Sequence, residues 1–69
     1  MSKTLRFKTY CFEIYKTAKN LNGCQTQQLF EKYGVLSYIY KVYDVLHSMS
    51  DSYITDDIDI YINSHSNMR

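Results

Sequence analysis

The sequence lacks most of the residues that interrupt or cross-link a small fold. It contains no proline and no tryptophan, and it has only two glycines and two cysteines. Because there is no proline and no low-complexity stretch, the chain offers no obvious linker, and the long segments between its few turn signals favour helices. No apolar run is long enough to cross a bilayer, so we expect no membrane association.

The two cysteines exclude further kinds of site. Cys11 and Cys24 fit no metal-binding spacing, and no cluster of cysteine or histidine completes a set of four ligands. We therefore expect neither a metal site nor a cofactor. Met1-Ser-Lys-Thr begins no signal-like segment, and two free thiols suit a reducing compartment. These features predict a cytoplasmic protein in which Cys11 packs as a small hydrophobic residue.

The chain is too short for more than one core. Its 69 residues form a single helical domain, which we expect to span 1–69 with an ordered part from about 3 to 64. A domain of this size buries only about 60% of the surface of its unfolded chain. Little room remains for a deep catalytic pocket, so the size argues against an enzyme.

Apolar periodicity predicts helices over residues 3–20, 24–33 and 36–49. The inner face of the first helix is predicted to consist of Phe7, Tyr10, Cys11, Ile14, Ala18 and Leu21. Asn22, with Gln25 three residues later, has the pattern of a capping box. Gly34 suits the left-handed end of the second helix.

The C-terminal segment 56–64 is ambiguous. Its isoleucines at 58, 60 and 62 alternate with polar residues as in a strand, whereas Thr55-Asp56-Asp57 looks like the start of a helix. A lone strand would have no partner, so we favour a helix, followed by a frayed tail over 64–69. The predicted fold class is all-α, a small bundle of three to four short helices.

The segment 36–49 has two apolar faces. One stripe consists of Val35, Ile39, Val42, Leu46 and Met49, and the second consists of Leu36, Tyr40, Tyr43 and His47. A small core needs only one stripe, so the second either packs inside the chain or forms an interface, and the sequence leaves this open. The chain has eight tyrosines, a residue enriched among binding hot spots.

Charge is unevenly distributed although the formal net charge is only +1. Residues 1–20 hold five basic residues and a single acidic one, Glu13, whereas residues 44–60 hold five aspartates and no basic residue. Two interpretations are open. Either the two ends attract each other within the fold, which we favour, or the acidic end faces a cationic partner site.

One pair of residues has the spacing of a catalytic base. Asp44 and His47 are three residues apart and would be neighbours on a helix, where a carboxylate can orient an imidazole. The sequence supplies no positioned nucleophile, no oxyanion site and no third metal ligand beside them. We therefore interpret the pair as a hydrogen bond on the helix surface and predict no enzymatic activity.

The basic first helix supports an alternative function. Its polar face carries Lys8, Lys16 and Lys19, and Phe12 interrupts this face. The combination suits a small nucleic-acid-binding regulator in which Phe12 stacks on a base. A helix-turn-helix is a weaker match, because the segment 36–49 carries only Lys41 as a basic residue.

Several short motifs resemble one family. The sequence contains Leu29-Phe30-Glu-Lys-Tyr33-Gly34-Val35 and Tyr38-Ile39, followed by Tyr43-Asp44-Val-Leu46-His47, Tyr53-Ile54, Asp57-Ile58 and Tyr61-Ile62. From about Phe7 to Ile62 the chain resembles the short bacterial proteins of the domain-of-unknown-function family 3791. The specific element is Tyr-Asp-x-Leu-His followed by Tyr-Ile-x-x-Asp-Ile. Ser48-Met49 departs from the pattern, because such proteins commonly have Thr-Gln after the histidine.

The resemblance implies a small helical protein with no established enzymatic activity. Members of this family are often encoded beside a toxin-like protein that resembles ADP-ribosyltransferases. The implied function is a non-catalytic protein-binding module, an antitoxin-like component of a bacterial or phage toxin–antitoxin or defence locus. We expect it to neutralise the toxin by occlusion.

The expected partner-binding residues combine the second stripe with the acidic segment. They are Tyr40, Tyr43, Asp44, His47, Tyr53, Asp56 and Asp57. The ring side chains of the stripe would anchor the contact, and the acidic segment around residues 56–59 would complement a basic nucleotide site. A homodimer through the second stripe and a phage-borne inhibitor of a host defence enzyme are further alternatives.

Overall fold

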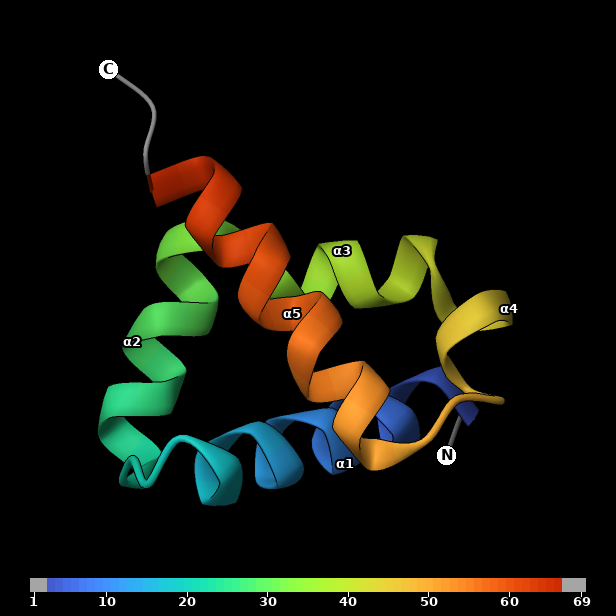
Figure 1. Ribbon diagram of the computed structural model, residues 1–69, viewed down its shortest axis with the longest axis horizontal. Helices are drawn as coiled ribbons and strands as arrows, with labels where there is room; N and C mark the ends of the chain where they lie inside the picture. The colour runs from blue at the N-terminus through green and yellow to red at the C-terminus, as the bar shows by residue number, and fades with distance from the viewer. Residues whose placement is uncertain (1–2, 67–69) are drawn as a thin grey trace.

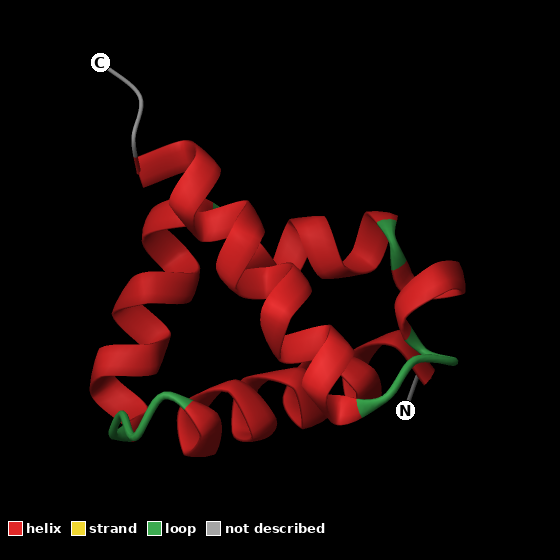
Figure 2. Cartoon of the chain, in the orientation of Figure 1, coloured by secondary structure: helices red, strands yellow, loops and turns green. Residues whose placement is uncertain are grey.

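Helices make up most of the part of the chain that the computed structural model describes, residues 3–66 (Figure 1, Figure 2). They are α1 (Lys3–Ala18), α2 (Gly23–Tyr33), α3 (Val35–Lys41), α4 (Tyr43–Leu46) and α5 (Asp51–Ser66). No strand occurs within residues 3–66, so the all-α prediction is confirmed. Residues 3–66 form five helices, rather than three or four, because the segment predicted as one helix over 36–49 forms two.

The turn between α1 and α2 is closed by backbone hydrogen bonds. Asn20 adopts the left-handed conformation, with φ 57°. The amides of Asn20 and Leu21 donate to the carbonyls of Thr17 and Lys16 at 3.2 and 2.9 Å. This is a Schellman arrangement, which satisfies carbonyls that the end of a helix would otherwise leave unpaired.

Both ends of α2 have the caps that the sequence predicts. The Asn22 side chain accepts from the Gln25 amide at 2.7 Å, and the Gln25 side chain accepts from the Asn22 amide at 3.0 Å, which completes the capping box. Gly34 has φ 62° and ψ 37°, a conformation that glycine adopts without a Cβ penalty. The turn leads directly into the fully buried Val35 at the start of α3.

The helix predicted over 36–49 is broken at Val42, which corrects the prediction. Val42 has φ −105° and ψ 15°, outside the helical region, and it separates α3 from the single turn of α4. Glycine and proline are absent from this stretch, so neither residue accounts for the break. After the break Leu46 is buried in the core, whereas Met49 is exposed.

The ambiguous C-terminal segment is a helix, and it begins at Asp51 rather than at residue 56. Ser50, and not Thr55, caps it, because the Ser50 hydroxyl accepts from the Tyr53 amide at 3.2 Å. The helix continues through Ser66, beyond the predicted limit of residue 64. The rest of the predicted tail, residues 67–69, lies outside the described residues.

α5 packs across the other helices and completes the core. In Figure 1, α1, α2 and α3 follow one another around the molecule, and α5 crosses in front of them; it contacts all three. The buried apolar cluster consists of Cys11, Tyr15, Phe30, Val35, Ile39, Leu46, Ile54, Ile58 and Ile62. Each of the five helices contributes to it. The α5 isoleucines in this cluster are four residues apart, on one face, and Ile60 points outward.

The buried face of α1 differs from the predicted one. Cys11 is fully buried as expected, and burial raises the pKa of its thiol to about 12. Tyr15 is also buried, although the predicted face omitted it, and Tyr10 on that face is exposed. Phe12 is half-buried and packs edge-on against Phe30, with ring centroids 5.5 Å apart.

Candidate functional site

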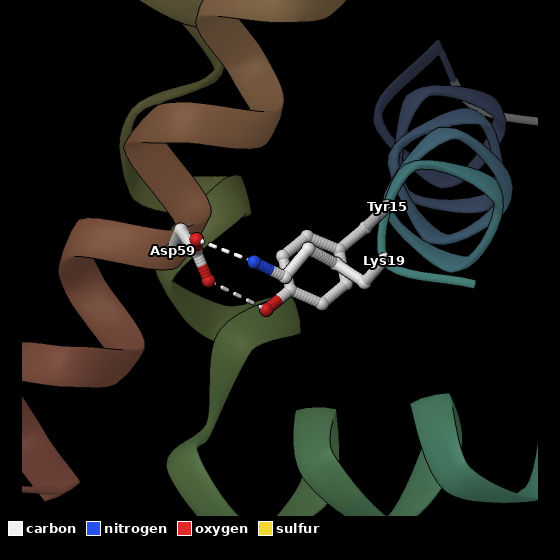
Figure 3. A network of polar contacts seen from close by, with 3 residues as sticks. All are labelled: Tyr15, Lys19 and Asp59. Carbon is white, nitrogen blue, oxygen red and sulfur yellow. Dashed lines mark hydrogen bonds and ion pairs between the residues drawn. The ribbon is translucent and has the colours of Figure 1, made fainter. Parts of the chain in front are cut away.

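Hydrogen bonds between tyrosines and aspartates tie α5 to α1 and α3. The pairs are Tyr10–Asp51, Tyr15–Asp59 and Tyr38–Asp57. The Tyr15 hydroxyl donates to Asp59 at 2.9 Å, and the second oxygen of Asp59 accepts from Lys19 at 2.8 Å. Figure 3 shows both donors, Tyr15 on α1 and Lys19 in the turn after it, reaching toward the carboxylate on α5. Tyr38 donates to Asp57 at 2.6 Å from the side of α3.

These pairs shift the pKa values of their members. Burial and the Asp59 carboxylate raise the pKa of Tyr15, and burial and the Asp57 carboxylate raise the pKa of Tyr38 to about 12. The Lys19 ammonium and the Tyr15 hydroxyl lower the pKa of Asp59, although its partial burial opposes them. Tyr15 therefore stays a neutral donor and Asp59 a charged acceptor over a wide pH range.

Much of the acidic segment is used inside the fold. Asp57 and Asp59, which we expected to face a partner, are half-buried and accept hydrogen bonds from Tyr38 and Tyr15. The Lys19–Asp59 ion pair agrees with the interpretation that the basic and acidic ends attract each other. The side chain of Asp56 is exposed and makes no hydrogen bond or ion pair within residues 3–66.

We expect Asp59→Ala to lower the free energy of unfolding by about 1–3 kcal/mol, because the buried Tyr15 hydroxyl then loses its acceptor. The same change in a Tyr15→Phe background should be less harmful, since no hydroxyl is left unpaired. Urea unfolding followed by circular dichroism measures this double-mutant cycle. Asp56→Ala is the matched control and should change stability by less than about 0.5 kcal/mol. Equal losses for the two aspartate variants would contradict the assignment.

A row of shallow hollows follows the junction of α1 with α3 and α4. Successive hollows share Lys8, Tyr40 and Tyr43 as lining residues, so they form one continuous surface. We call this surface the Tyr40 seam and define it by Leu5, Lys8, Leu36, Tyr40, Lys41 and Tyr43. The hollows are open to solvent, which suits the side chains of a docked macromolecule better than an enclosed small ligand.

Tyr40 lies in the middle of the seam, and 64% of its surface is exposed. Tyr38, two residues earlier, faces α5, and two residues correspond to about 200° around a helix, so Tyr40 points the opposite way. The Lys8 ammonium lies 5.4 Å from the centroid of the Tyr40 ring, in a cation–π contact. Tyr40 adds nothing to the buried core, so the fold alone does not account for an aromatic residue here.

Tyr43 and His47 line the end of the seam near the start of α1. The half-buried Tyr43 ring packs edge-on against Phe7 at 5.3 Å and stacks on the His47 ring at 4.6 Å. His47 Nδ1 donates to the Tyr43 carbonyl at 2.7 Å, since a carbonyl oxygen can only accept. The predicted hydrogen bond between Asp44 and His47 is absent within residues 3–66, where Nδ1 of the ring bonds to the backbone instead.

The structure brings together part of the predicted partner-binding set. Tyr40, Tyr43, Asp44 and His47 lie along the seam, whereas Tyr53, Asp56 and Asp57 lie on α5 and line none of its hollows. The expected partner-binding set left out Leu5 and Lys41, and Leu36 was placed on the second stripe without being named as a site residue. The position of Leu5 could have indicated a surface role, since it is an apolar residue on the lysine face of α1, which does not face the core.

Of the residues of the nucleic-acid alternative, Lys8 and Phe12 line one hollow of the seam, whereas Lys16 and Lys19 line none of its hollows. Lys16 and Lys19 each pair with a carboxylate, at 3.2 and 2.8 Å. Phe12 packs against the core rather than standing free as a stacking platform. Of the four residues only Lys8 lies beside an exposed aromatic ring, that of Tyr40.

Metal ligands do not cluster in the described part of the chain. Within residues 3–66, no group of three or more histidine, cysteine, aspartate or glutamate side chains is arranged to hold a metal ion. Both thiols are free, with Cys11 buried and Cys24 exposed. None of the helices formed by these residues combines the length and the apolar character needed to cross a membrane.

Comparison with known proteins points to one family. The family model described as "Protein of unknown function (DUF3791)" matches residues 6–65. This range includes the segment over which the tyrosine and aspartate motifs resemble that family. No curated protein and no solved structure matches the chain.

Proposed function

The chain belongs to the DUF3791 family, and we propose that it is a non-catalytic protein-binding module that docks its partner along the Tyr40 seam. The observation that carries the proposal is the exposed Tyr40 ring between apolar and basic side chains. Tyrosine in such a setting is typical of interface hot spots.

Two features of the seam favour tight docking. Leu5 and Leu36 are 49% and 39% exposed, so a partner that covers them removes apolar surface from water. Tyr43 and His47 are already stacked on each other, so these rings lose little rotational freedom when a partner binds. A contact built on prearranged rings and exposed leucines gains affinity without a change in the fold.

The partner is proposed to be a toxin-like protein encoded beside this one, neutralised by occlusion. This part of the proposal rests on the family resemblance. The mechanism differs from the one expected from the sequence, because Asp57 and Asp59 already accept hydrogen bonds within the fold. We therefore propose that the partner contacts the Tyr40 seam rather than the acidic segment.

A nucleic-acid-binding regulator is the second candidate. Lys8 and Lys41 border the exposed Tyr40 ring, which makes Tyr40 a better stacking residue than the packed Phe12. Inhibition of a host defence enzyme would rely on the same docking surface as toxin neutralisation and differs only in the target protein. A homodimer would instead place two seams against each other.

Titration calorimetry with the product of the neighbouring gene tests the proposal. Tyr40→Ala combined with His47→Ala should weaken binding by at least about 30-fold and abolish neutralisation, since hot-spot truncations typically remove 2 kcal/mol or more. Circular dichroism checks that the variant is folded.

A matched control is available on α5. His65 repeats the geometry of His47, with Nδ1 donating to the Tyr61 carbonyl at 2.9 Å, and Tyr53 is an exposed tyrosine. Tyr53→Ala combined with His65→Ala should bind like the parent. If the seam variant keeps parental affinity, or if the α5 variant loses as much, the proposed surface is wrong.

A further inference from the structure

The charges along the Tyr40 seam are mostly of one sign. The basic residues that line its hollows are Lys3, Arg6, Lys8 and Lys41. None of them forms an ion pair within residues 3–66. The acidic lining residues are Glu13, which is already paired with Lys16 at 3.2 Å, and Asp44. The seam therefore has a positive charge that the fold does not neutralise.

One end of the seam is apolar. Leu5, Phe12 and Leu36 line the same hollow, which Lys8 also borders. A phosphate group gains nothing from this surface, whereas an aliphatic or aromatic side chain that fills it is removed from water. An apolar hollow followed by unpaired cations fits an acidic protein segment better than it fits a nucleic-acid strand.

Building on the proposed function, we infer that the partner segment occupying the Tyr40 seam is an acidic amphipathic helix. A large apolar residue of this helix fills the hollow between Leu5 and Leu36, and its carboxylates pair with Lys8, Lys41 and Arg6. The seam follows α1 from residue 3 to residue 12, a rise of about 14 Å, which a partner helix of about ten residues matches.

A display selection of random peptides on the immobilised full chain tests the chemistry of the occupant. The Tyr40→Ala protein serves as counter-target, so that only peptides dependent on the seam are retained. We expect the retained peptides to carry net negative charge and at least one large apolar residue. Retained peptides that are neutral or basic, or the absence of any retained peptide, would overturn the inference.

Charge reversal on the protein is the second measurement. The best retained peptide, made synthetically, should bind the Arg6→Glu and Lys41→Glu proteins at least about tenfold more weakly and should lose affinity as salt is raised. Lys32→Glu is the control, because Lys32 is exposed on α2, lines none of the hollows and changes the net charge equally. Equal weakening by all three variants would indicate a general charge effect and overturn the inference.

Binding of oligonucleotides distinguishes the nucleic-acid-binding candidate from the acidic helix. If thymidine or uridine homopolymers bind more tightly than the best peptide, and Lys41→Glu weakens them, the seam binds phosphate and the acidic helix is excluded. Failure of the inference and failure of the proposed function are distinguishable. Seam-dependent peptides that are neutral or basic would contradict only the inference of an acidic helix. A neighbouring gene product that binds equally well without the Tyr40 and His47 side chains would contradict the protein-docking function itself.

Discussion

Replacing Ile58 with alanine is expected to unfold a large fraction of the protein at room temperature. Ile58 is fully buried and is the middle member of the stripe of isoleucines through which α5 enters the core. Such a substitution typically lowers stability by about 2–5 kcal/mol, through lost transfer energy and the cavity left behind. A core in a chain this short rarely supplies more than about 3–5 kcal/mol, so one cavity removes most of the stability.

The matched control is Ile60→Ala, the same change two residues along the same helix. Ile60 is 67% exposed, so its replacement should alter the free energy of unfolding by less than about 0.5 kcal/mol. Urea unfolding of both variants, followed by circular dichroism, makes the comparison. A comparable loss in the two proteins would contradict the observed packing, because it would require Ile60 to be covered in solution.

The caps around α2 could be predicted because their determinants are local. The capping box needs only Asn22 and Gln25 at the right spacing, and the left-handed turn needs only a residue without a Cβ, Gly34. In both cases the preference lies within a few residues of sequence. The positions of both caps and the conformation of Gly34 could therefore be predicted without knowledge of the rest of the fold.

The break at Val42 could not be predicted, because no local signal marks it. A straight helix over 36–49 satisfies the apolar periodicity equally well, and valine is tolerated in helices. After the turn Leu46 lies in the core cluster, to which α1 and α5 also contribute. The start of α5 was missed for a related reason, since Ser50 and Thr55 are both acceptable N-caps and only packing decides between them.

The tyrosines show a similar limit. The sequence suggests that tyrosine serves either the core or an interface, but the structure adds a third use, as a donor to aspartates of α5. Tyr15 and Asp59 are 44 positions apart in sequence, and Tyr38 and Asp57 are 19 apart, so no local pattern connects them. Only the crossing of α5 over α1 and α3 brings each hydroxyl to its carboxylate.

The candidate site was predictable in part. The periodicity of an α-helix placed Tyr40 on a different face of 36–49 from Ile39 but left open whether that face is buried, and in the structure Tyr40 is exposed. The part contributed by α1 was not predictable, since the pairing of α1 with α3 depends on tertiary packing. Lys8 and Leu36 therefore belong to one surface for reasons that neither segment shows alone.

The other large effect is expected at alkaline pH, where unfolding should accompany the ionisation of tyrosine. Burial and hydrogen bonds to carboxylates raise the pKa of Tyr15, and they raise the pKa of Tyr38 to about 12. An unfolded tyrosine loses its proton near pH 10. Because the folded state holds these protons longer, their contribution to stability is complete below about pH 10 and is lost as pH rises toward 12 and beyond.

A pH titration followed by both circular dichroism and tyrosinate absorbance checks this expectation. Helix should be lost over the pH range in which tyrosinate forms. Tyr15→Phe combined with Tyr38→Phe should reduce the decline of stability above about pH 10, even though this variant starts from a lower stability at neutral pH. The buried Cys11 thiol is present in both proteins, so its ionisation cancels in the comparison.

Exposed tyrosines provide the control for this titration. Tyr40→Phe combined with Tyr53→Phe removes the same number of hydroxyls, but neither of these hydroxyls donates to a carboxylate within residues 3–66. This variant should keep the steep parental decline, because it leaves the hydrogen bonds of Tyr15 and Tyr38 to the α5 carboxylates in place. If instead the Tyr15 and Tyr38 variant declines as steeply as the parent, the bonds to α5 do not determine alkaline stability, and the loss of helix must begin at another group.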